Sequence, residues 1–431
     1  MYALYSFLFF LALCVYAPVY FLRLKFGNKE ALYIRERLGL RLPPIRPGTP
    51  AIWLHAVSVG EVLSLRRLIS EIKKRHPSWH IYFSTLTATG YKIAKEKLAD
   101  TDGIFLVPLD FGWTVRRFFS FLRPRLFVLA ESEFWPQLLR QAARTCPAVV
   151  LINGRISRRS FRRYRRLAVL ARRFLSPIDQ FLVQTEGDRN RLMRIGLPGE
   201  RVEVAGNLKA DIRLPSVSSE ERDDLKRQIG LALETKVIIA GSTHKGEEEK
   251  ILRAFKGAKA FRQDLGIVIA PRHPKRSTEV EKIGDGLSLR VVRRTQGVSN
   301  RPWDVLILDT IGELARFYAL ADLAFIGGSL VPHGGQNLLE PAYYGKPLLF
   351  GPHMENFAFL ADLFVREGAA RIVRDWTELR EDFSMKDEKA LAERGIRARE
   401  ILVSLQGATE RTIRVIESLM ERTAGQKETK P

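Results

Sequence analysis

The sequence predicts an α/β protein built from two consecutive Rossmann-like domains, and three observations lead to this prediction. Short apolar segments alternate along the chain with stretches of helical character, which is typical of βαβ units and a parallel sheet. This series breaks once, at Gly206-Asn207, and resumes after a polar stretch. The chain also has 431 residues, which is more than a single hydrophobic core ordinarily holds.

The first domain is expected over residues 26–210. Its predicted strands are the apolar segments 49–56, 81–85, 103–109, 126–130, 149–153, 181–184 and 202–205. Helices are expected between them, the first from about Val62 to Arg75 and the second from Tyr91.

The second domain is expected over residues 211–422, after a boundary near Gly206 to Pro215. Its predicted strands are 237–240, 266–270, 289–293, 305–308, 323–326, 348–350 and 370–373. One helix from about Lys386 to Arg422 is predicted to close the domain, and the polar tail 423–431 is predicted to be disordered. Ligands of open α/β sheets bind beyond the carboxyl ends of the strands, so we expect two such sheets to face each other across a cleft.

The N-terminal segment 1–25 is predicted to be a membrane-anchor helix. Residues 1–22 carry no charge and are rich in Leu, Phe, Tyr and Val, and Arg23 and Lys25 follow at once. A signal peptide would begin with positive charge and end in small residues, and neither feature is present. The basic flank places the body of the protein on the cytoplasmic side. Whether the segment spans the bilayer, inserts as a hairpin or interfacial anchor, or is a buried first helix stays open.

Composition limits the partners. A net charge of +22 indicates an anionic partner, which is nucleic acid, an acidic membrane surface or a phosphorylated substrate. Two cysteines exclude a disulfide framework, and the absence of a CxxC spacing argues against a structural metal site. The nine arginines of 155–173 would form a broad basic face that binds anionic lipid, or only a solvated surface. No nucleic-acid-binding module accompanies them.

The stretch from Leu320 to Phe357 carries the most specific pattern. It contains, in order, G-G-S, H-G-G-Q-N, L-E-P-A, G-K-P and G-P-H, which predicts a strand, a glycine-rich loop, a helix start, a turn and a second strand. Glycines let a ligand approach the backbone, and a helix N-terminus holds phosphate. In the helix expected from Gln336, Glu340 would accept hydrogen bonds from a ribose diol. The pattern predicts a nucleotide-sugar site; the alternative is an ordinary βα connection.

Polar residues gather where strands are expected to end. Glu61 follows a glycine at a strand-to-helix turn, where a carboxylate can take a proton from an attacking hydroxyl. The helix N-terminus would keep it ionised and lower its basicity, and its alternative role is to complement the helix dipole. Glu131 and Glu133 follow the fourth strand, and Arg272 suits phosphate. Lys209 lies at the domain joint, from which it would reach an anionic donor.

These residues fall in motifs that resemble the bacterial 3-deoxy-D-manno-octulosonic acid (Kdo) transferases of lipopolysaccharide synthesis. The resemblance covers nearly the whole chain. The matching motifs are His55 to Glu61, Thr85 to Gly90, Glu131 to Pro136, Asn153 to Ser157, Gly206 to Lys209, Ala270 to His273 and Gly334 to Ala342. One departure is Leu338, where many relatives have proline.

The resemblance implies a GT-B glycosyltransferase at the cytoplasmic face of the bacterial inner membrane, with the acceptor site in its N-terminal half. It implies CMP-Kdo as donor, a lipid A precursor (lipid IVA) as acceptor, and neither cofactor nor metal. Glu61 matches the family's general base, and Glu131 and Lys209 match positions that support the transition state; Glu133 stays an alternative to Glu131. The residues that match CMP-binding positions are Pro271, Arg272, Ile311, Gly312, Glu313, Asn337, Leu338, Leu339 and Glu340.

The mechanism that the resemblance implies is direct, inverting transfer without a covalent enzyme intermediate. Two other functions stay open: another GT-B enzyme, with a UDP-sugar donor, and a non-catalytic basic protein that binds a membrane surface. The sequence does not give the number of Kdo residues transferred, the acylation of the acceptor or the oligomeric state.

Overall fold

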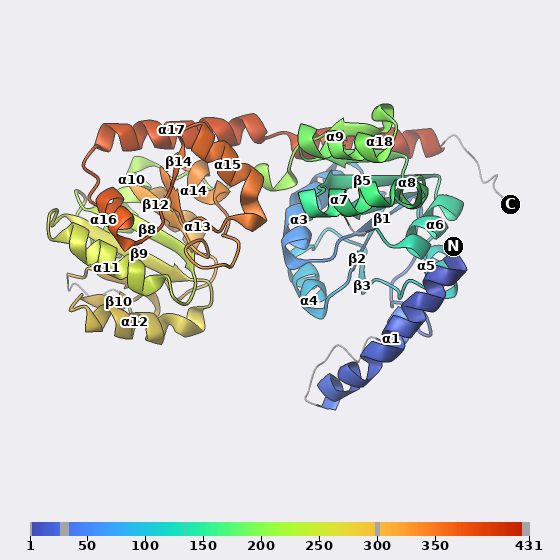
Figure 1. Ribbon diagram of the computed structural model, residues 1–431, viewed down its shortest axis with the longest axis horizontal. Coiled ribbons are helices and arrows are strands. Elements are labelled where there is room, and N and C mark those ends of the chain that lie inside the picture. The colour runs from blue at the N-terminus through green and yellow to red at the C-terminus, as the bar shows by residue number, and fades with distance from the viewer. Residues whose placement is uncertain (1, 26–33, 133, 298–301, 425–431) are drawn as a thin grey trace. The chain divides into compact units, whose positions relative to one another are not determined.

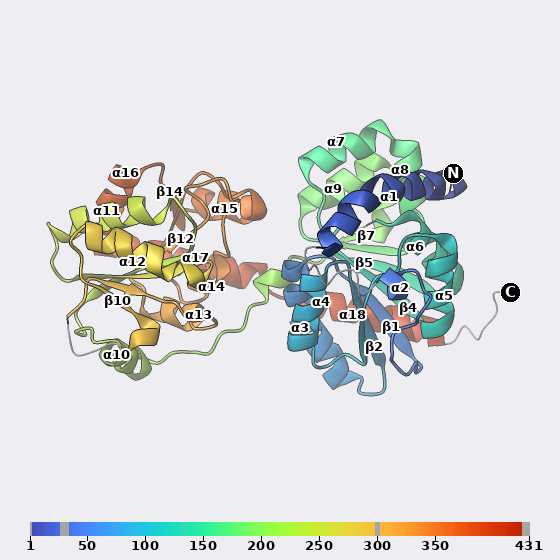
Figure 2. The same ribbon diagram turned by 90° about the horizontal axis from the view of Figure 1, so that it is seen from below.

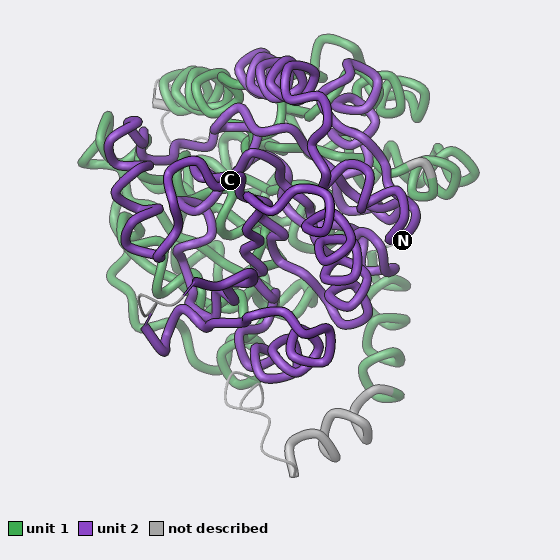
Figure 3. Tube along the Cα trace, turned by 90° about the vertical axis from the view of Figure 1, so that its left-hand side faces the viewer, with its two compact units in different colours: residues 1–211, 406–431 green, residues 212–405 purple. Residues whose placement is uncertain are grey.

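The chain folds into two compact units, each built around one parallel sheet (Figure 1). The computed structural model describes residues 2–25, 34–132, 134–297 and 302–424, apart from the side chains of 16–25 and 158. Unit 1 comprises residues 1–211 and 406–431, and unit 2 comprises residues 212–405 (Figure 3). The two Rossmann-like domains that the sequence predicts are therefore confirmed.

Unit 1 contains a seven-stranded sheet in the order β3-β2-β1-β4-β5-β6-β7. Its strands are β1 (Ala51–His55), β2 (His80–Thr85), β3 (Gly103–Leu106), β4 (Leu126–Ala130), β5 (Ala148–Gly154), β6 (Gln180–Val183) and β7 (Val202–Val204). The chain builds the sheet outward from β1 to one edge and then, from β4, to the other. Ligands of doubly wound sheets bind where this direction reverses, which here is the carboxyl end of β1 and β4.

Successive side chains along each strand point to opposite faces of the sheet and pack into two hydrophobic cores. On β1, Trp53 enters one core, whereas Ile52 and Leu54 enter the other. The Trp53 core is covered by α5 (Gly112–Leu122), α6 (Pro136–Thr145), α8 (Ala168–Leu175) and α9 (Glu186–Ile195). The opposite core is covered by α3 (Val59–Arg75), α4 (Ala88–Lys97) and α18 (Ala408–Ala424), and Figure 2 separates α3 and α4 from α5 and α6. The short α2 (Ile34–Arg37) and α7 (Arg158–Arg166) complete the unit.

Unit 2 contains a second seven-stranded sheet, in the order β10-β11-β9-β8-β12-β13-β14. Its strands are β8 (Lys236–Thr243), β9 (Leu265–Pro271), β10 (Val291–Arg293), β11 (Val305–Ile307), β12 (Leu323–Ile326), β13 (Leu348–Phe350) and β14 (Ala370–Ile372). Its helices are α10 (Ser219–Gln228), α11 (Glu248–Lys259), α12 (Ser277–Gly286), α13 (Leu314–Phe317), α14 (Leu339–Tyr343), α15 (Ala358–Arg366), α16 (Trp376–Phe383) and α17 (Glu388–Leu405). The direction reverses between β8 and β12.

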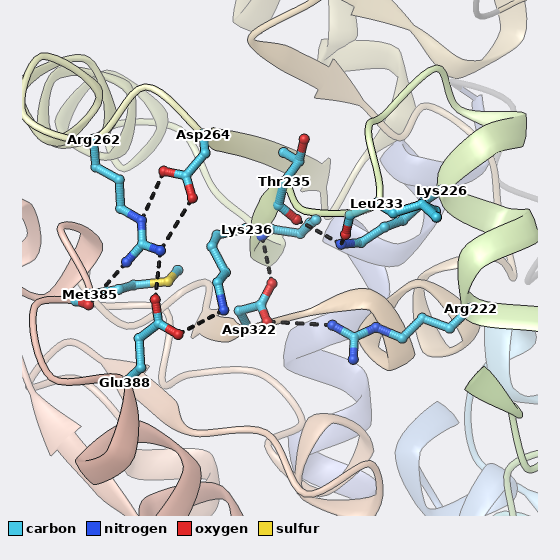
Figure 4. Close-up of polar contacts among 11 residues, drawn as sticks. Arg222, Lys226, Leu233, Thr235, Lys236, Arg262, Asp264, Asp322, Met385 and Glu388 are labelled. Atoms are coloured by element: carbon cyan, nitrogen blue, oxygen red, sulfur yellow. Dashed lines mark hydrogen bonds and ion pairs between the residues drawn. The ribbon is translucent and has the colours of Figure 1, made fainter. Parts of the chain in front are cut away.

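Charged side chains fix the amino ends of the unit 2 strands (Figure 4). Asp322 precedes β12, accepts a hydrogen bond from the Val237 N–H (2.8 Å) and lies 3.4 Å from an Arg222 nitrogen. Glu388, at the start of α17, pairs with Lys236 at 2.9 Å. The charge at this end of the sheet is therefore used for structure, and the opposite, carboxyl end carries the candidate ligand residues.

The C-terminal region differs from the prediction of one helix over 386–422. The structure has α17 in unit 2 and α18 in unit 1, and the break falls at Gly407. Gly407 has φ of +95°, in the left-handed region that favours glycine and ends a helix. Unit 2 therefore ends at Leu405, and the expected domain boundary at residue 422 is wrong.

Asp211 holds α18 on unit 1. Its carboxylate accepts hydrogen bonds from the backbone N–H groups of Gly407 (2.6 Å) and Thr409. Beyond this contact, α18 buries Ile413 and Ile416 in the core above α3. The helix continues to Ala424, so the first two residues of the expected tail are helical, and the rest of that tail lies outside the described residues.

The N-terminal helix α1 (Tyr2–Lys25) packs its first turns on unit 1. Gln137 of α6 donates hydrogen bonds to the Tyr2 carbonyl (3.2 Å) and to Ser6 Oγ (2.7 Å), and the rings of Phe9 and Trp135 lie 6.3 Å apart. Among the side chains of 2–15, the large exposed hydrophobics are Leu4, Phe7, Leu8, Phe10, Leu11 and Val15. Across the parts of the chain that the structure describes, no helix combines the length and apolarity needed to cross a membrane. The membrane anchor stays a prediction.

Candidate active site

Polar residues of unit 1 converge at the carboxyl ends of three adjacent strands, β1, β4 and β5. Glu61 lies in the first turn of α3, which follows β1, and Glu131 directly follows β4. Asn153 lies near the end of β5, and Lys209 lies in a 3₁₀ turn (Leu208–Ala210) that follows β7. This is the position where the strand order predicts a ligand.

Glu61 is held by both of its carboxylate oxygens. Oε2 accepts a hydrogen bond from the Val57 N–H and Oε1 accepts one from the Ser58 hydroxyl, both at 2.8 Å. The residue is only 8% exposed, and this burial raises the pKa of Glu61 by more than the two hydrogen bonds lower it; the negative charge of Glu131 raises it further. The expectation that the helix N-terminus lowers the basicity of Glu61 is therefore wrong, because burial raises its pKa.

Glu131, Asn153 and Lys209 contact one another. The Lys209 Nζ and the Asn153 Nδ2 each lie 3.5 Å from the same oxygen, Glu131 Oε1. Asn153 Oδ1 accepts a hydrogen bond from the Leu208 N–H (3.1 Å) and so fixes the turn that carries Lys209. Since Glu131 also acts on the pKa of Glu61, the structure brings the three predicted catalytic residues together. The alternative carboxylate, Glu133, lies outside the described residues.

The backbone is strained at this cluster. Glu131 and Asn153 have φ values of 59° and 52°, in the left-handed region that side chains other than glycine rarely adopt. Such conformations cost on the order of 1–3 kcal/mol and concentrate at active sites. Two of them, in contact and at adjacent strand ends, support a functional rather than a purely structural role for this edge.

His55 begins the first sequence motif, and the structure places it inside the protein. The residue is fully buried at the end of β1, and its Nδ1 lies 2.9 Å from Ser84 Oγ. Burial lowers the pKa of His55 to about 4, so the ring is neutral at physiological pH. His55 therefore supports the strand end and does not act as an exposed acid or base.

In unit 2, the carboxyl end of β8, where the strand order reverses, carries the buried carboxylate of Glu247. No role for this residue was predicted from the sequence. This residue is fully buried in the loop after β8. Its carboxylate accepts hydrogen bonds from four backbone N–H groups: Gly328 (2.6 Å), Ser329 (2.9 Å), Leu330 (2.8 Å) and His244 (2.8 Å). The amides of 328–330, at the start of the glycine-rich loop after β12, are therefore bound by the protein itself and are not available to a phosphate. In the sequence Glu247 begins an ordinary run of three glutamates at a helix start, which gives no signal of this role.

Glycines that follow β12 and β13 allow close backbone packing. A side chain at Gly327 would place its Cβ 2.3 Å from the Ser242 carbonyl oxygen, and one at Gly351 would meet the Ser329 carbonyl oxygen at 2.2 Å. The Gly351 N–H also donates to Ser329 Oγ at 2.8 Å. These close contacts between the ends of neighbouring strands restrict the backbone conformation of the loop.

The helix predicted to start at Gln336 begins only at Leu339. Asn337 causes the delay, because its Oδ1 accepts a hydrogen bond from the Leu339 N–H (3.1 Å) while its Nδ2 donates to Glu340 Oε1 (3.1 Å). Glu340 lies in the first helical turn, and burial raises its pKa. Leu338 and Leu339 are fully buried, so either of them would contact a ligand only through its backbone. The backbone N–H groups of 336–338 have no acceptor among the described residues.

The other predicted CMP-binding residues lie at the same edge of the sheet, because β11, β9, β8 and β12 are adjacent. They are Pro271, Arg272, Ile311, Gly312 and Glu313. Arg272 is exposed, and its N–H donates to the Thr243 carbonyl at 2.9 Å. Ile311 is 91% exposed. Burial opposes the charge of Glu313, but hydrogen bonds from Thr310 and Arg294 outweigh it and lower the pKa of Glu313.

The arginine-rich segment forms two helices, α7 and α8, instead of one continuous face. The break between the two helices falls at Leu167. Three apolar side chains at or near this break are exposed: Leu167 (55%), Val169 (74%) and Leu170 (38%). The exposed arginines of the two helices are Arg159, Arg162, Arg163, Arg165, Arg166, Arg172 and Arg173. Basic and apolar side chains therefore share one exposed surface of unit 1.

The chain is similar in sequence to several known proteins. The family model described as 3-Deoxy-D-manno-octulosonic-acid transferase (kdotransferase) matches residues 33–212. The 3-deoxy-D-manno-octulosonic acid transferase of Haemophilus influenzae is 30% identical over 90% of this chain and 92% of its own length. The enzyme of the same name from Chlamydophila psittaci is 32% identical over 77% of this chain and 76% of its own length.

The chain is also similar to solved structures. The UDP-GlcNAc 2-epimerase of Neisseria meningitidis, bound to UDP-GlcNAc, is 13% identical with a TM-score of 0.60, and the match covers 85% of this chain and all of that one. At this identity the likeness shows the fold alone. The C-terminal CMP-Kdo binding domain of WaaA from Acinetobacter baumannii is 31% identical with a TM-score of 0.40, and the match covers 42% of this chain and 96% of that domain.

Proposed function

Because this chain belongs to the 3-deoxy-D-manno-octulosonic acid (Kdo) transferase family and is a glycosyltransferase, we propose that it transfers Kdo from CMP-Kdo to a lipid A precursor, lipid IVA, and releases CMP. The observation that carries this proposal is the cluster of Glu61, Glu131 and Lys209 at the carboxyl ends of the unit 1 strands. A buried carboxylate beside a second carboxylate and an ammonium group provides the groups that a glycosyl transfer needs.

Glu61 is the proposed general base. A base works best when its pKa lies near the working pH, and burial raises the pKa of Glu61 toward that range. Glu61 takes the proton of an acceptor hydroxyl while the oxygen of that hydroxyl attacks the anomeric carbon of Kdo. The bond from that carbon to the CMP phosphate breaks with its electron pair, so CMP leaves as an anion and the configuration inverts. No covalent enzyme intermediate is formed.

Glu131 and Lys209 are proposed to stabilise the charges that develop in this step. The sugar gains oxocarbenium character as CMP leaves, and the carboxylate of Glu131 offsets this positive charge. Lys209 offsets the negative charge of the departing phosphate. Their 3.5 Å contact and the strained backbone of Glu131 support roles that depend on accurate placement.

Unit 2 is proposed to bind the CMP part of the donor. The support is the gathering of predicted CMP-binding residues at one sheet edge, with exposed Arg272 available for the phosphate and Glu340 for the ribose. The backbone N–H groups of 336–338, for which the described part of the chain provides no acceptor, add hydrogen-bond donors at that edge. Unit 1 correspondingly is proposed to bind the acceptor.

The protein is further proposed to act at the cytoplasmic face of the bacterial inner membrane. The exposed apolar residues of α1 and the basic and apolar surface of α7 and α8 support association with anionic lipid and with a phosphorylated lipid acceptor. Association through these surfaces does not require that α1 crosses the bilayer.

A turnover assay tests the proposal. The purified full chain in detergent is given CMP-Kdo and a tetraacylated lipid A precursor, and the products are followed by mass spectrometry. We expect a mass gain of one or more Kdo units, and the mass gives the number added. In Glu61→Gln the rate should fall by about 10²- to 10⁴-fold, the usual contribution of a general base. Glu71→Gln, on the same helix but paired with Lys74, is the matched control and should retain activity.

Two outcomes would contradict the proposal. Turnover of UDP-sugars without turnover of CMP-Kdo would make the donor assignment wrong and leave only the fold and family. Full activity in Glu61→Gln would exclude it as the base. Absence of turnover with every nucleotide sugar, together with binding to anionic vesicles, would favour a non-catalytic membrane-surface protein.

A further inference from the structure

Three histidines of unit 2 gather in one place, although they are far apart in the sequence. The ring centroids of His244 and His333 lie 4.3 Å apart with an angle of 24° between the planes, and those of His244 and His273 lie 6.2 Å apart at 83°. They come from the loops that follow β8, β12 and β9, which are adjacent strands. The three histidines, called the histidine cluster below, therefore lie at the candidate donor-binding edge of unit 2, yet no role has been assigned to them.

The cluster is surrounded by positive charge. Burial is the main cause that lowers the pKa of His244 to about 4, and His333, His273, Arg272 and Arg276 all lower it further. Every named electrostatic contribution thus has the same sign. The His244 ring is therefore neutral at physiological pH, and the positive charge beside the cluster is that of Arg272 and Arg276.

The nearby carboxylates offset the charge of Arg276, which pairs with Glu248 and Glu279, but among the described residues none of them pairs with Arg272. Glu247 is engaged by four backbone N–H groups, and Glu248 is paired with Arg276 at 2.6 Å and accepts a hydrogen bond from the Thr243 hydroxyl. Among the residues that the structure describes, ion pairs between a histidine and a carboxylate involve other histidines, His76, His80 and His353. The histidine cluster has no such partner.

Hydrogen-bond donors are available on the cluster. The Gln336 side-chain amide nitrogen lies 3.2 Å from His244 Nε2. An amide NH₂ group only donates, so Nε2 of the neutral ring accepts and the ring proton is on Nδ1. His273 and His333 are exposed, and so is the Arg272 side chain beside them. The cluster therefore offers imidazole N–H groups and a guanidinium group to a ligand at the surface.

We infer that the histidine cluster is a binding subsite for an oxyanion of the sugar-nucleotide donor. This inference rests on the proposed function, because a donor such as CMP-Kdo carries two oxyanions, the sugar carboxylate and the phosphate. Either oxyanion would accept hydrogen bonds from the imidazoles and offset the positive charge of Arg272. The subsite distinguishes an acidic sugar donor from a neutral one if it binds the carboxylate, and it fixes the leaving group if it binds the phosphate.

Binding measurements on the full chain separate the two oxyanions. Isothermal titration calorimetry would compare CMP-Kdo, CMP and cytidine as ligands of the wild-type protein, of His333→Ala and of His244→Gln. The exposed His333 can be replaced without disturbing the core, and glutamine keeps the hydrogen bonding of His244 but cannot carry charge. Arg253→Ala removes a positive charge from the exposed surface of α11 and is the control variant.

Hydrogen bonds to a charged group are worth about 1.5–3 kcal/mol, so His333→Ala should weaken binding about 10- to 100-fold, and His244→Gln, which keeps a hydrogen-bond donor, should weaken it less. Weaker binding of CMP-Kdo with unchanged binding of CMP identifies the sugar carboxylate as the ligand. Equal weakening for CMP-Kdo and CMP with unchanged binding of cytidine identifies the phosphate. Arg253→Ala should bind all three ligands as the wild-type protein does.

The inference and the proposed function fail in different ways. If the wild-type protein binds CMP-Kdo and both histidine variants bind it equally well, the histidine cluster is not a subsite, while the proposed donor stands. If the wild-type protein binds neither CMP-Kdo nor CMP, the proposed donor is wrong and the inference falls with it.

Discussion

The replacement Glu247→Ala tests the structural account of unit 2 most directly. It removes the carboxylate that accepts hydrogen bonds from the backbone N–H groups of Gly328, Ser329, Leu330 and His244. Each buried N–H group that loses its partner costs about 1–3 kcal/mol. Burial raises the pKa of Glu247, which means that the buried negative charge itself destabilises the folded state. The alanine variant removes this charge and so regains part of the lost stability. We expect a net destabilisation of about 3–5 kcal/mol, as for other broken buried polar contacts.

Urea unfolding followed by circular dichroism measures this loss, and hydrogen exchange of the 328–330 amides locates it. The matched control is Glu249→Ala, two residues along the chain, which removes only an exposed contact with Arg253 and should cost less than about 0.5 kcal/mol. Glu247→Gln keeps the volume but turns one acceptor into a donor, so it should also be destabilised. A loss below about 1 kcal/mol in Glu247→Ala, with unchanged exchange of the three amides, would refute the reasoning.

The pH dependence of the same variant gives an independent check. The folded-state pKa of Glu247 is raised above its unfolded value, so protonation favours the folded state. The stability that wild type holds over Glu247→Ala should therefore decrease as the pH rises from the ordinary glutamate pKa through the raised one, and level off above it. A difference that grows with pH in this window would mean that the carboxylate is stabilised in the fold as an anion.

Three further predictions follow from other parts of the chain. Because the pKa of Glu61 is raised, turnover should fall as the pH drops through a pKa higher than that of an ordinary glutamate; a rate profile set by an ordinary carboxylate pKa would contradict this. Glu61→Gln should fold as stably as wild type at neutral pH. Lys209→Met should lower the rate of Kdo transfer by at least tenfold. Its thermal unfolding temperature should stay within a few degrees of the wild-type value, since the contact between Lys209 and Glu131 is half-exposed. Unchanged kinetics would exclude Lys209 from the mechanism. A chain ending at Leu405 loses α18, whose four large buried side chains contribute about 6–12 kcal/mol to the stability of unit 1. Calorimetry of this chain should therefore show a single cooperative transition, that of unit 2, and a second cooperative transition would refute the prediction.

Strand positions could be predicted from the sequence because parallel strands are covered on both faces. β4 is apolar over its whole length, and the segment 126–130 was delimited by composition alone. Polar residues at the ends of such strands necessarily share one edge, which is why Glu61 and Glu131 were found together. The adjacent strand order, and therefore the meeting of Glu131 with Lys209, depends on pairing between distant segments that a single sequence does not reveal.

Helix ends and buried charges were harder to predict. The helix expected from Gln336 starts later, where the Asn337 side chain accepts a hydrogen bond from the Leu339 N–H, and the long C-terminal helix breaks at Gly407 because α18 returns to unit 1. Glu247 was missed because three of its four backbone partners lie more than 80 residues away, and a glutamate at a helix start has a common alternative explanation. In each case tertiary contacts decide the outcome and local sequence does not.

The return of α18 to unit 1 has a consequence for biosynthesis. Unit 1 begins the chain, but its core is complete only when the last helix has been made. A ribosome adding about 5–20 residues per second needs roughly 10–40 s to synthesise the inserted unit, and throughout this time the surface that will receive Ile413 and Ile416 is uncovered. Unit 2, although it emerges later, has all of its own elements before unit 1 does. The nascent chain therefore finishes its second domain first, and a message truncated near its 3′ end yields a folded C-terminal unit attached to an incomplete N-terminal one.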